Sequence, residues 1–190
     1  KLILVTDNAS NYTVVTGFQQ KIFTNYNLPA NQGNFLIITH PVLTTGSNPV
    51  EEYRAYRNSA AGGSHNAKTY FIDDLVDQFA FGIKKHPLSI RNFIRFAKDR
   101  FVQEPENIFL IGKGVQYVHH RTFENNPDMA KLNLIPTFGL PASDNLYTAN
   151  PGSSLKLMSI GRLSAINTDE VKLYLEKVKE YEFAQSTSSQ

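Results

Sequence analysis

The sequence predicts an α/β fold in which a mostly parallel sheet of about four strands lies between helices on both faces. Short apolar runs such as Phe35–Thr39 (FLIIT) lack alternating polar residues, which indicates strands buried on both sides. Helical segments with one apolar stripe separate these runs along the chain. The alternation of strands and helices favours a doubly wound, three-layer arrangement.

The chain is predicted to contain one α/β domain with two flanking segments. Residues 1–33 are expected to be an N-terminal β segment or the end of a preceding β domain, with short strands at Lys1–Thr6 and Tyr12–Thr16. The α/β domain is expected over residues 34–183. Residues 184–190 lose all periodicity and are expected to fray.

The first strand is followed by a predicted helix with clear end signals. Asn48 is suited to the N-cap, Pro49 to the first helical position, and Glu51 follows the cap by three residues. Gly62–Gly63 are expected to stop this helix. Residues 115–154 are expected to be a long connection interrupted by prolines.

Three more strands and two more helices complete the predicted domain. The strands are expected at Lys68–Ile72, Ile108–Ile111 and Leu157–Ile160. Pro87 opens one helix, and a capping box from Asn167 to Glu170 opens the other. Their apolar stripes are expected to face the core: Ile90, Phe93, Ile94, Ala97 and Phe101 in the first helix; Val171, Tyr174, Leu175, Val178 and Tyr181 in the second.

Composition excludes several classes of function. The net charge is +2 without a dense Lys/Arg cluster, so nucleic acid is not an expected partner. No apolar run approaches the roughly 20 residues needed to span a bilayer. The chain starts on a strand-like run with no export signal, which suggests a fragment of a longer protein. It has no Cys, so it cannot itself supply a thiolate nucleophile.

Three strand ends are candidate sites, because ligands of open α/β sheets lie at the carboxyl ends of strands. They are Gly112-Lys113-Gly114, the loop after Ile72 that carries Asp73 and Asp74, and Gly161-Arg162. The first resembles part of a phosphate loop, but the upstream glycine and the following hydroxyl are missing. A glycine-flanked turn with an exposed lysine is the simpler interpretation.

Other polar residues have interpretations without catalysis. His119-His120 lack the further ligands of a metal site and are expected to be loop histidines. Ser143 has no GxSxG elbow, and Asp144 is expected to cap a turn or hold a loop through backbone amides. Arg162 is expected to brace loops rather than bind substrate. Glu182 is expected to be a solvated charge.

Several ordered segments together resemble the first subdomain of the gingipain-type cysteine peptidase family, which includes the sortase-like component of type IX secretion. They span roughly residues 34–182 and include VEEYRAYRNSAAGGSHNAKTYFIDDLVDQFAFGI, NIFLIGKG, IPTFGLPASDNLYT, SIGRLSA and EVKLYLEKVKEYE. The resemblance implies a caspase-like, flavodoxin-related α/β fold in two subdomains. The catalytic histidine and cysteine would belong to a second subdomain beyond Gln190, so no catalytic, cofactor or metal residue is assigned here.

The resemblance also implies partners and a location. The missing catalytic subdomain would be the intramolecular partner, protein substrates would bind the parent, and the parent would be extracellular or at the cell surface. A family calcium site is doubtful because Lys113 replaces the usual aspartate, and an ammonium cannot ligate calcium. Lys113, Asp144 and Arg162 are candidates for structural or subdomain contacts. The alternatives are an inactive scaffold module and a phosphate-binding domain that uses Lys113.

Overall fold

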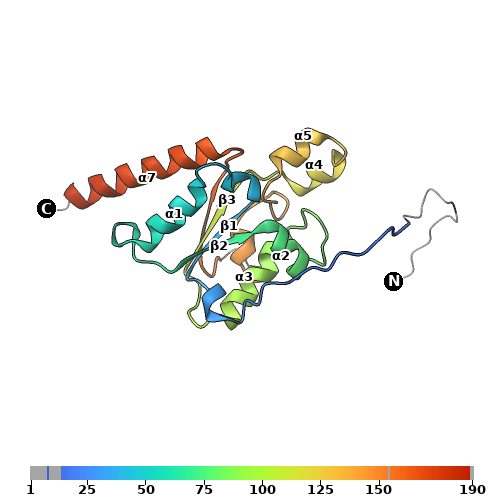
Figure 1. Ribbon diagram of the computed structural model, residues 1–190, viewed down its shortest axis with the longest axis horizontal. Coiled ribbons are helices and arrows are strands. Elements are labelled where there is room, and N and C mark those ends of the chain that lie inside the picture. Colours follow the sequence, from blue (N-terminus) through green and yellow to red (C-terminus); the bar gives the residue numbers. More distant parts are fainter. Residues whose placement is uncertain (1–7, 9–13, 154, 189–190) are drawn as a thin grey trace.

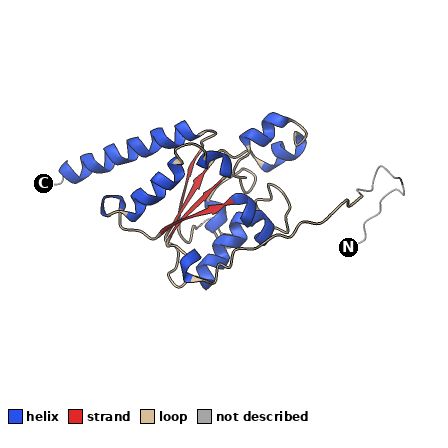
Figure 2. Ribbon diagram, in the orientation of Figure 1, coloured by secondary structure: helices blue, strands red, loops and turns tan. Residues whose placement is uncertain are grey.

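A sheet of four parallel strands forms the centre of the protein. The computed structural model describes residues 8, 14–153 and 155–188. Its strands lie in the order β2-β1-β3-β4 (Figures 1 and 2), which confirms the predicted α/β fold. They are β1 (Phe35–Thr39), β2 (Ala67–Phe71), β3 (Asn107–Ile111) and β4 (Ser159–Leu163).

Helices cover both faces of the sheet, as Figure 2 shows. One face carries α1 (Pro49–Asn58) and α7 (Thr168–Ser188). The other carries α2 (Ile72–Phe79), α3 (Leu88–Arg100) and the short α6 (Asn145–Thr148). The remaining helices are α4 (Tyr117–Thr122), α5 (Pro127–Leu132) and the 3-10 turns η2 (Pro29–Asn31), η3 (Pro41–Thr44) and η4 (Ala60–Gly62).

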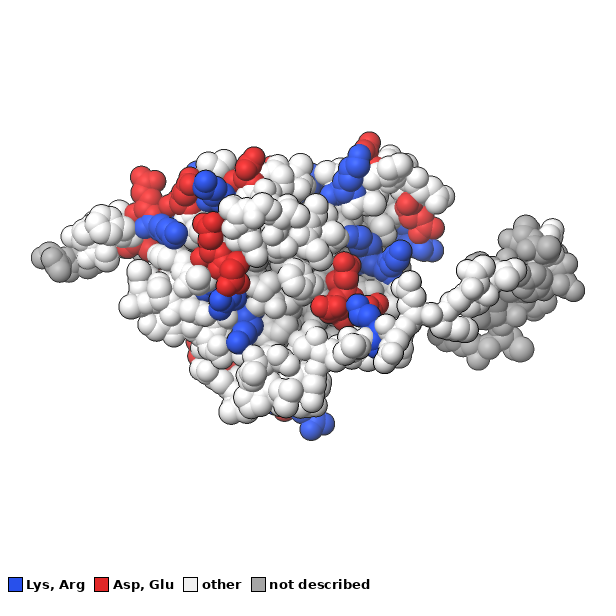
Figure 3. All heavy atoms as spheres, in the orientation of Figure 1, with Lys and Arg blue, Asp and Glu red and all other residues white. Residues whose placement is uncertain are grey.

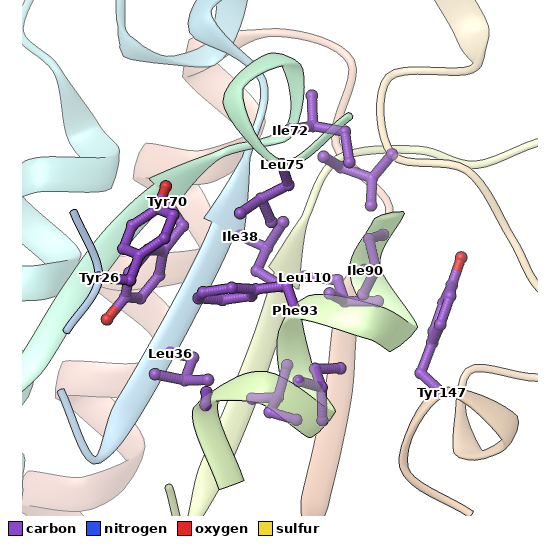
Figure 4. Close-up of a cluster of buried hydrophobic side chains, with 14 of the residues drawn as sticks. Tyr26, Leu36, Ile38, Tyr70, Ile72, Leu75, Ile90, Phe93, Leu110 and Tyr147 are labelled. Carbon is purple, nitrogen blue, oxygen red and sulfur yellow. The ribbon is translucent and has the colours of Figure 1, made fainter. Parts of the chain in front are cut away.

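Alternate side chains of a strand point to opposite faces of the sheet, so they belong to two separate cores. All five residues of β1 are buried; Leu36 and Ile38 face α2 and α3, whereas Phe35 and Ile37 face α1 and α7. Figure 4 shows the first core, in which the Phe93 ring lies beside the rings of Tyr26 and Tyr70. The centroid of this ring is 4.7 Å from that of Tyr70 and 5.4 Å from that of Tyr26.

The second core joins α7 to α1 on one face of the sheet. Val171 and Leu175 are buried as predicted. Beyond them the prediction is wrong: Tyr181 is 64% exposed, and the helix continues to Ser188 instead of fraying from residue 184. Glu182 is not merely solvated either. Its Oε1 accepts from Arg57 at 2.8 Å and its Oε2 accepts from the Tyr56 hydroxyl at 2.6 Å, so it ties the far part of α7 to α1.

Two predicted boundaries need correction at the carboxyl ends of strands. The predicted loop after Ile72 is instead α2, which begins at Ile72 itself. Ile72 and Leu75 of this helix are buried, and the acidic Asp73 and Asp74 in its first turn suit the positive end of the helix dipole. Strand β4 begins at Ser159, so Arg162 lies inside the strand and not in a turn after it.

Smaller differences concern the connections. Helix α1 ends at Asn58, earlier than predicted, and the turn η4 that follows it ends at the predicted stop, Gly62–Gly63. The long connection over residues 115–154 contains three short helices, α4, α5 and α6. The predicted strand Lys1–Thr6 lies outside the described residues. The described part of the second predicted strand, residues 14–16, has no regular secondary structure.

Removal of the Phe93 ring tests whether the α2/α3 core dominates stability. We expect Phe93→Ala to lower the free energy of unfolding by about 3–5 kcal/mol, because it leaves a cavity among buried aromatic rings. Urea unfolding measures the change. Leu173→Ala, at a side chain that is 56% exposed on α7, should change it by less than about 0.5 kcal/mol. Equal effects of the two substitutions would contradict this packing.

Candidate functional site

The carboxyl edge of the sheet contains the place where the chain reverses its direction of winding. From β1 the chain first adds β2 on one side, and then β3 on the other. In open α/β sheets, ligand sites lie at this switch point. Thr39 at the end of β1 is buried, and its Oγ1 donates to the carbonyl of Ile111 at the end of β3, 3.0 Å away. The next residue, His40, is the N-cap of η3, and its side chain accepts from the Val42 amide.

The turn after β3 passes very close to residues 133–137. The amides of Leu134 and Ile135 both donate to the Lys113 carbonyl, at 2.9 and 3.0 Å. A Cβ atom at Gly112, where φ is +146°, would lie 2.6 Å from Cγ1 of Ile135, and one at Gly114 would lie 2.5 Å from the Ile135 carbonyl oxygen. Both glycines are therefore required by close approach. The Lys113 side chain is half-buried and bonds to no described residue.

Arg162 on β4 holds this turn and its neighbour together. Its Nε and Nη2 donate to the two carboxylate oxygens of Asp144, each at 2.8 Å. Nη1 donates to the carbonyls of Gly112 (2.8 Å) and Ile135 (2.9 Å), and Nη2 also donates to that of Pro136 (3.0 Å). The five N–H groups of the guanidinium thus all have acceptors. The side chain is only 11% exposed.

This arrangement leaves Arg162 no donor for a substrate. Asp144 lies just before α6, but its side chain accepts no backbone amide there, so the expected turn-capping role is wrong. Its partner is Arg162, and that pair was not foreseen. Tyr147 supports the same loop, because its buried hydroxyl donates to the Pro136 carbonyl at 2.7 Å. Burial also raises the pKa of Tyr147, so it stays a neutral donor.

The other candidate residues do not assemble into a catalytic or metal site. His119 and His120 lie on α4 and not in a loop; His119 is exposed beside Phe123, and His120 is partly buried. Ser143 uses its amide to donate to the Phe138 carbonyl at 2.8 Å. Within residues 8, 14–153 and 155–188, no group of three or more His, Asp or Glu side chains could hold a metal ion.

An open apolar groove of about 760 Å³ also lies at this edge, beside the end of β1. Its walls come from three distant segments, which are η3, α5 with the residues that follow it, and the loop before α7, so no local motif predicts it. The residues are His40, Val42, Asp128, Ala130, Lys131, Leu132, Leu134 and Ile166. The groove offers a large apolar surface, and its ionisable side chains are His40 and the ion pair between Lys131 and Asp128. Burial lowers the pKa of His40, and nearby Lys85 lowers it further.

Replacement of Arg162 tests whether its hydrogen bonds to Asp144 and to the carbonyls of Gly112, Ile135 and Pro136 hold the two loops together, an arrangement we call the Arg162 brace. Arg162→Lys retains the charge but cannot form the fork to Asp144 while also reaching three carbonyls. We expect it to lower the free energy of unfolding by about 1.5–3 kcal/mol. It should also speed amide hydrogen exchange at Leu134 and Ile135. The matched control Arg100→Lys, on the exposed end of α3, should change neither quantity. Unchanged exchange in Arg162→Lys would contradict the bracing role.

Comparison with known proteins identifies the family. The family model described as Peptidase family C25 matches residues 28–190. A crystal structure of dimeric latent PorU from Porphyromonas gingivalis is similar to this chain, with a TM-score of 0.55 and 16% sequence identity. The similarity covers 76% of this chain and 15% of the PorU chain. No curated protein matches. The match over most of the sequence shows that the chain belongs to the gingipain family of cysteine peptidases, C25.

Proposed function

We propose that this chain is the non-catalytic N-terminal α/β subdomain of a gingipain-like cysteine peptidase. Membership of a cysteine peptidase family in a chain with no Cys is the observation on which the proposal rests. A cysteine peptidase needs a thiolate that attacks the peptide carbonyl and a histidine that assists it. Both groups would come from a second subdomain of the same polypeptide, and protein substrates would bind to the assembled parent.

The braced edge of the sheet supports a buttressing role. The turn after β3 and the segment 133–137 are fixed to β4 by Arg162, so they offer a rigid surface at the carboxyl ends of the strands. Rigid support is what a catalytic pair on a neighbouring unit needs, because small displacements of reacting groups reduce rates strongly. The apolar groove beside this edge gives the neighbouring unit a surface to bury.

The free edge of β4 supports extension of the sheet. The amide of Ser159 donates to the Glu106 carbonyl, and the Leu163 carbonyl accepts from Gly112, so these two residues of β4 face β3. By alternation, the backbone groups of Ile160 and Arg162 point away from β3, and within the described part of the chain no strand pairs with them. An unpaired strand edge is a template for another strand.

Export to the cell surface or outside the cell belongs to the same proposal. It rests on the family and on the similarity to PorU. Among the described residues, no helix is both long and apolar enough to cross a membrane. The Lys113 turn would not hold calcium in this role, because its side chain is a cation.

A comparison of the isolated chain with the longer parent polypeptide tests the proposal. We expect no peptide hydrolysis by the 190-residue chain, and hydrolysis by the parent that alkylation with iodoacetamide abolishes. In the parent, Arg162→Lys should lower kcat several-fold, because the support of the catalytic pair is loosened, and Arg100→Lys should leave it unchanged.

Two results would overturn the proposal. Hydrolysis by the isolated chain that survives alkylation would show that the chain is itself catalytic. A folded parent without alkylation-sensitive hydrolysis, and with no cysteine at a strand end after Gln190, would favour an inactive scaffold module of an exported protein instead.

A further inference from the structure

The loop between α2 and α3 has an unusual backbone and an unusual surface. Over residues 80–86 it holds two non-glycine residues at positive φ, Phe81 (55°) and Lys85 (57°). Such conformations are unfavourable for residues with side chains, and they are common at functional sites. The Phe81 side chain is 95% exposed, and that of Ile83 is 54% exposed. Apolar side chains therefore project from a loop held in a strained conformation.

This loop and α4 together form a pocket of about 500 Å³ with a cationic lining. The loop supplies Lys84, Lys85 and His86, and α4 supplies His120 and Arg121. No basic cluster is visible in the sequence because residues 87–119 lie between the two groups. Figure 3 shows Lys and Arg side chains gathered on this part of the surface, between α2 and the α4–α5 unit.

The pocket has too few acidic groups for its cations. Glu124 is the acidic residue of its lining, and it already accepts from Arg121 at 2.6 Å. Neither Lys84 nor Lys85 forms an ion pair or hydrogen bond with a described residue. The Nδ1 atom of His120 is buried, and it too lacks a partner in the described part of the chain. A buried polar atom without a partner is unfavourable, and a ligand is one way to satisfy it.

Lys85 is the cation that most affects the other ionisable groups of this region. Burial lowers the pKa of the Lys85 amine, and the carboxylate of Asp73 only partly offsets this. Burial also lowers the pKa values of His40 and His120, and the Lys85 charge lowers both further. The Lys85 charge thus disfavours protonation of both histidines, and Asp73 offsets only part of this at His40. An anion bound there would relieve the repulsion.

We propose that this pocket binds carboxylate side chains of an acidic polypeptide segment. The carboxylate would accept from the Lys85 ammonium and from His120. Ile83, Tyr117 and Ala130 also line the pocket, and their apolar surface suits the methylene groups of a glutamate. An inorganic phosphate has no apolar part to bury there, and the pocket has neither a glycine-rich loop nor a free arginine fork for it. The exposed Phe81 and Ile83 can contact apolar residues that flank the glutamates.

The pocket is independent of the proposed peptidase role. The loop at residues 80–86 and α4 form it, and neither Arg162 nor a catalytic subdomain contributes to it. A failure of either proposal therefore leaves the other standing.

Titration of the ¹⁵N-labelled 190-residue chain with a synthetic peptide tests the site. The probe is an acetylated, amidated hexapeptide, Glu-Leu-Glu-Glu-Leu-Glu, at low ionic strength; its Gln-for-Glu counterpart and inorganic phosphate are titrated separately. We expect amide shifts at residues 83–86 and 117–121 with the acidic peptide only. Lys85→Gln should weaken binding about ten-fold, the loss expected for one charged hydrogen bond. The control Lys177→Gln, on the exposed face of α7, should change it less than two-fold.

Each contrary outcome overturns the site. Equal binding of the Gln peptide would show that carboxylates are not recognised, and equal weakening by Lys177→Gln would show a diffuse charge effect. Tighter binding of phosphate in the same pocket would make this a site for small anions instead. Absence of shifts at 10-fold excess over a millimolar chain would remove the site altogether. If Lys85→Gln fails to fold by circular dichroism, Lys84→Gln at an exposed position of the same pocket replaces it.

Discussion

Burial of β1 on both faces is the constraint on which the rest of the structure depends. All five residues of this strand are shielded from water, so helices must cover both sides of the sheet. Its backbone groups also need partners on both edges, because buried amides and carbonyls without hydrogen bonds are strongly unfavourable. The strand must therefore lie between two others, which are β2 and β3. Placing β2 and β3 on opposite sides forces the chain to reverse its winding direction, and this reversal creates the edge where the groove and the braced turn lie.

The parts of the fold that local patterns determine were predictable. The apolar run at β1 and the stripe of α3 correspond to the observed elements, since each has one periodicity along its whole length. Helix α2 was missed because its apolar residues follow those of β2 with no polar or turn residue between them. Strand β4 was placed too early because Gly161-Arg162 looked like a terminator. Gly161 instead lies within the strand, where a Cβ would be in ordinary contact, 3.9 Å from the Phe109 ring.

The contacts that define the surface sites could not be predicted from local sequence. Asp144 and Arg162 were both candidates, but they are 18 residues apart, and nothing in the spacing says that one is the partner of the other. The pairing arises only in the tertiary fold, where α6 packs against α3 and the carboxylate of Asp144 meets the Arg162 side chain from β4. The cationic pocket is even less predictable from local sequence. Lys85 and His120 both line it, although strand β3 and the turn after it lie between them in sequence. Only the order of the strands decides which loops become neighbours.

The two basic side chains at this end of the molecule show how a structural cation differs from a binding one. Arg162 is nearly buried, yet each of its donors has an acceptor and its charge is matched by Asp144. Such a group fixes loops but has no capacity left for a ligand. Lys85 is also partly buried, but it has no ion-pair partner among the described residues. The carboxylate of Asp73 acts on it without such a contact and offsets only part of the cost of its burial. Arg162 gains favourable electrostatic free energy from its ion pair with Asp144. Lys85 gains a comparable free energy only when a ligand supplies the carboxylate of the ion pair. Unsatisfied hydrogen-bonding capacity, and not the residue type or its burial, is what marks Lys85 as a binding group.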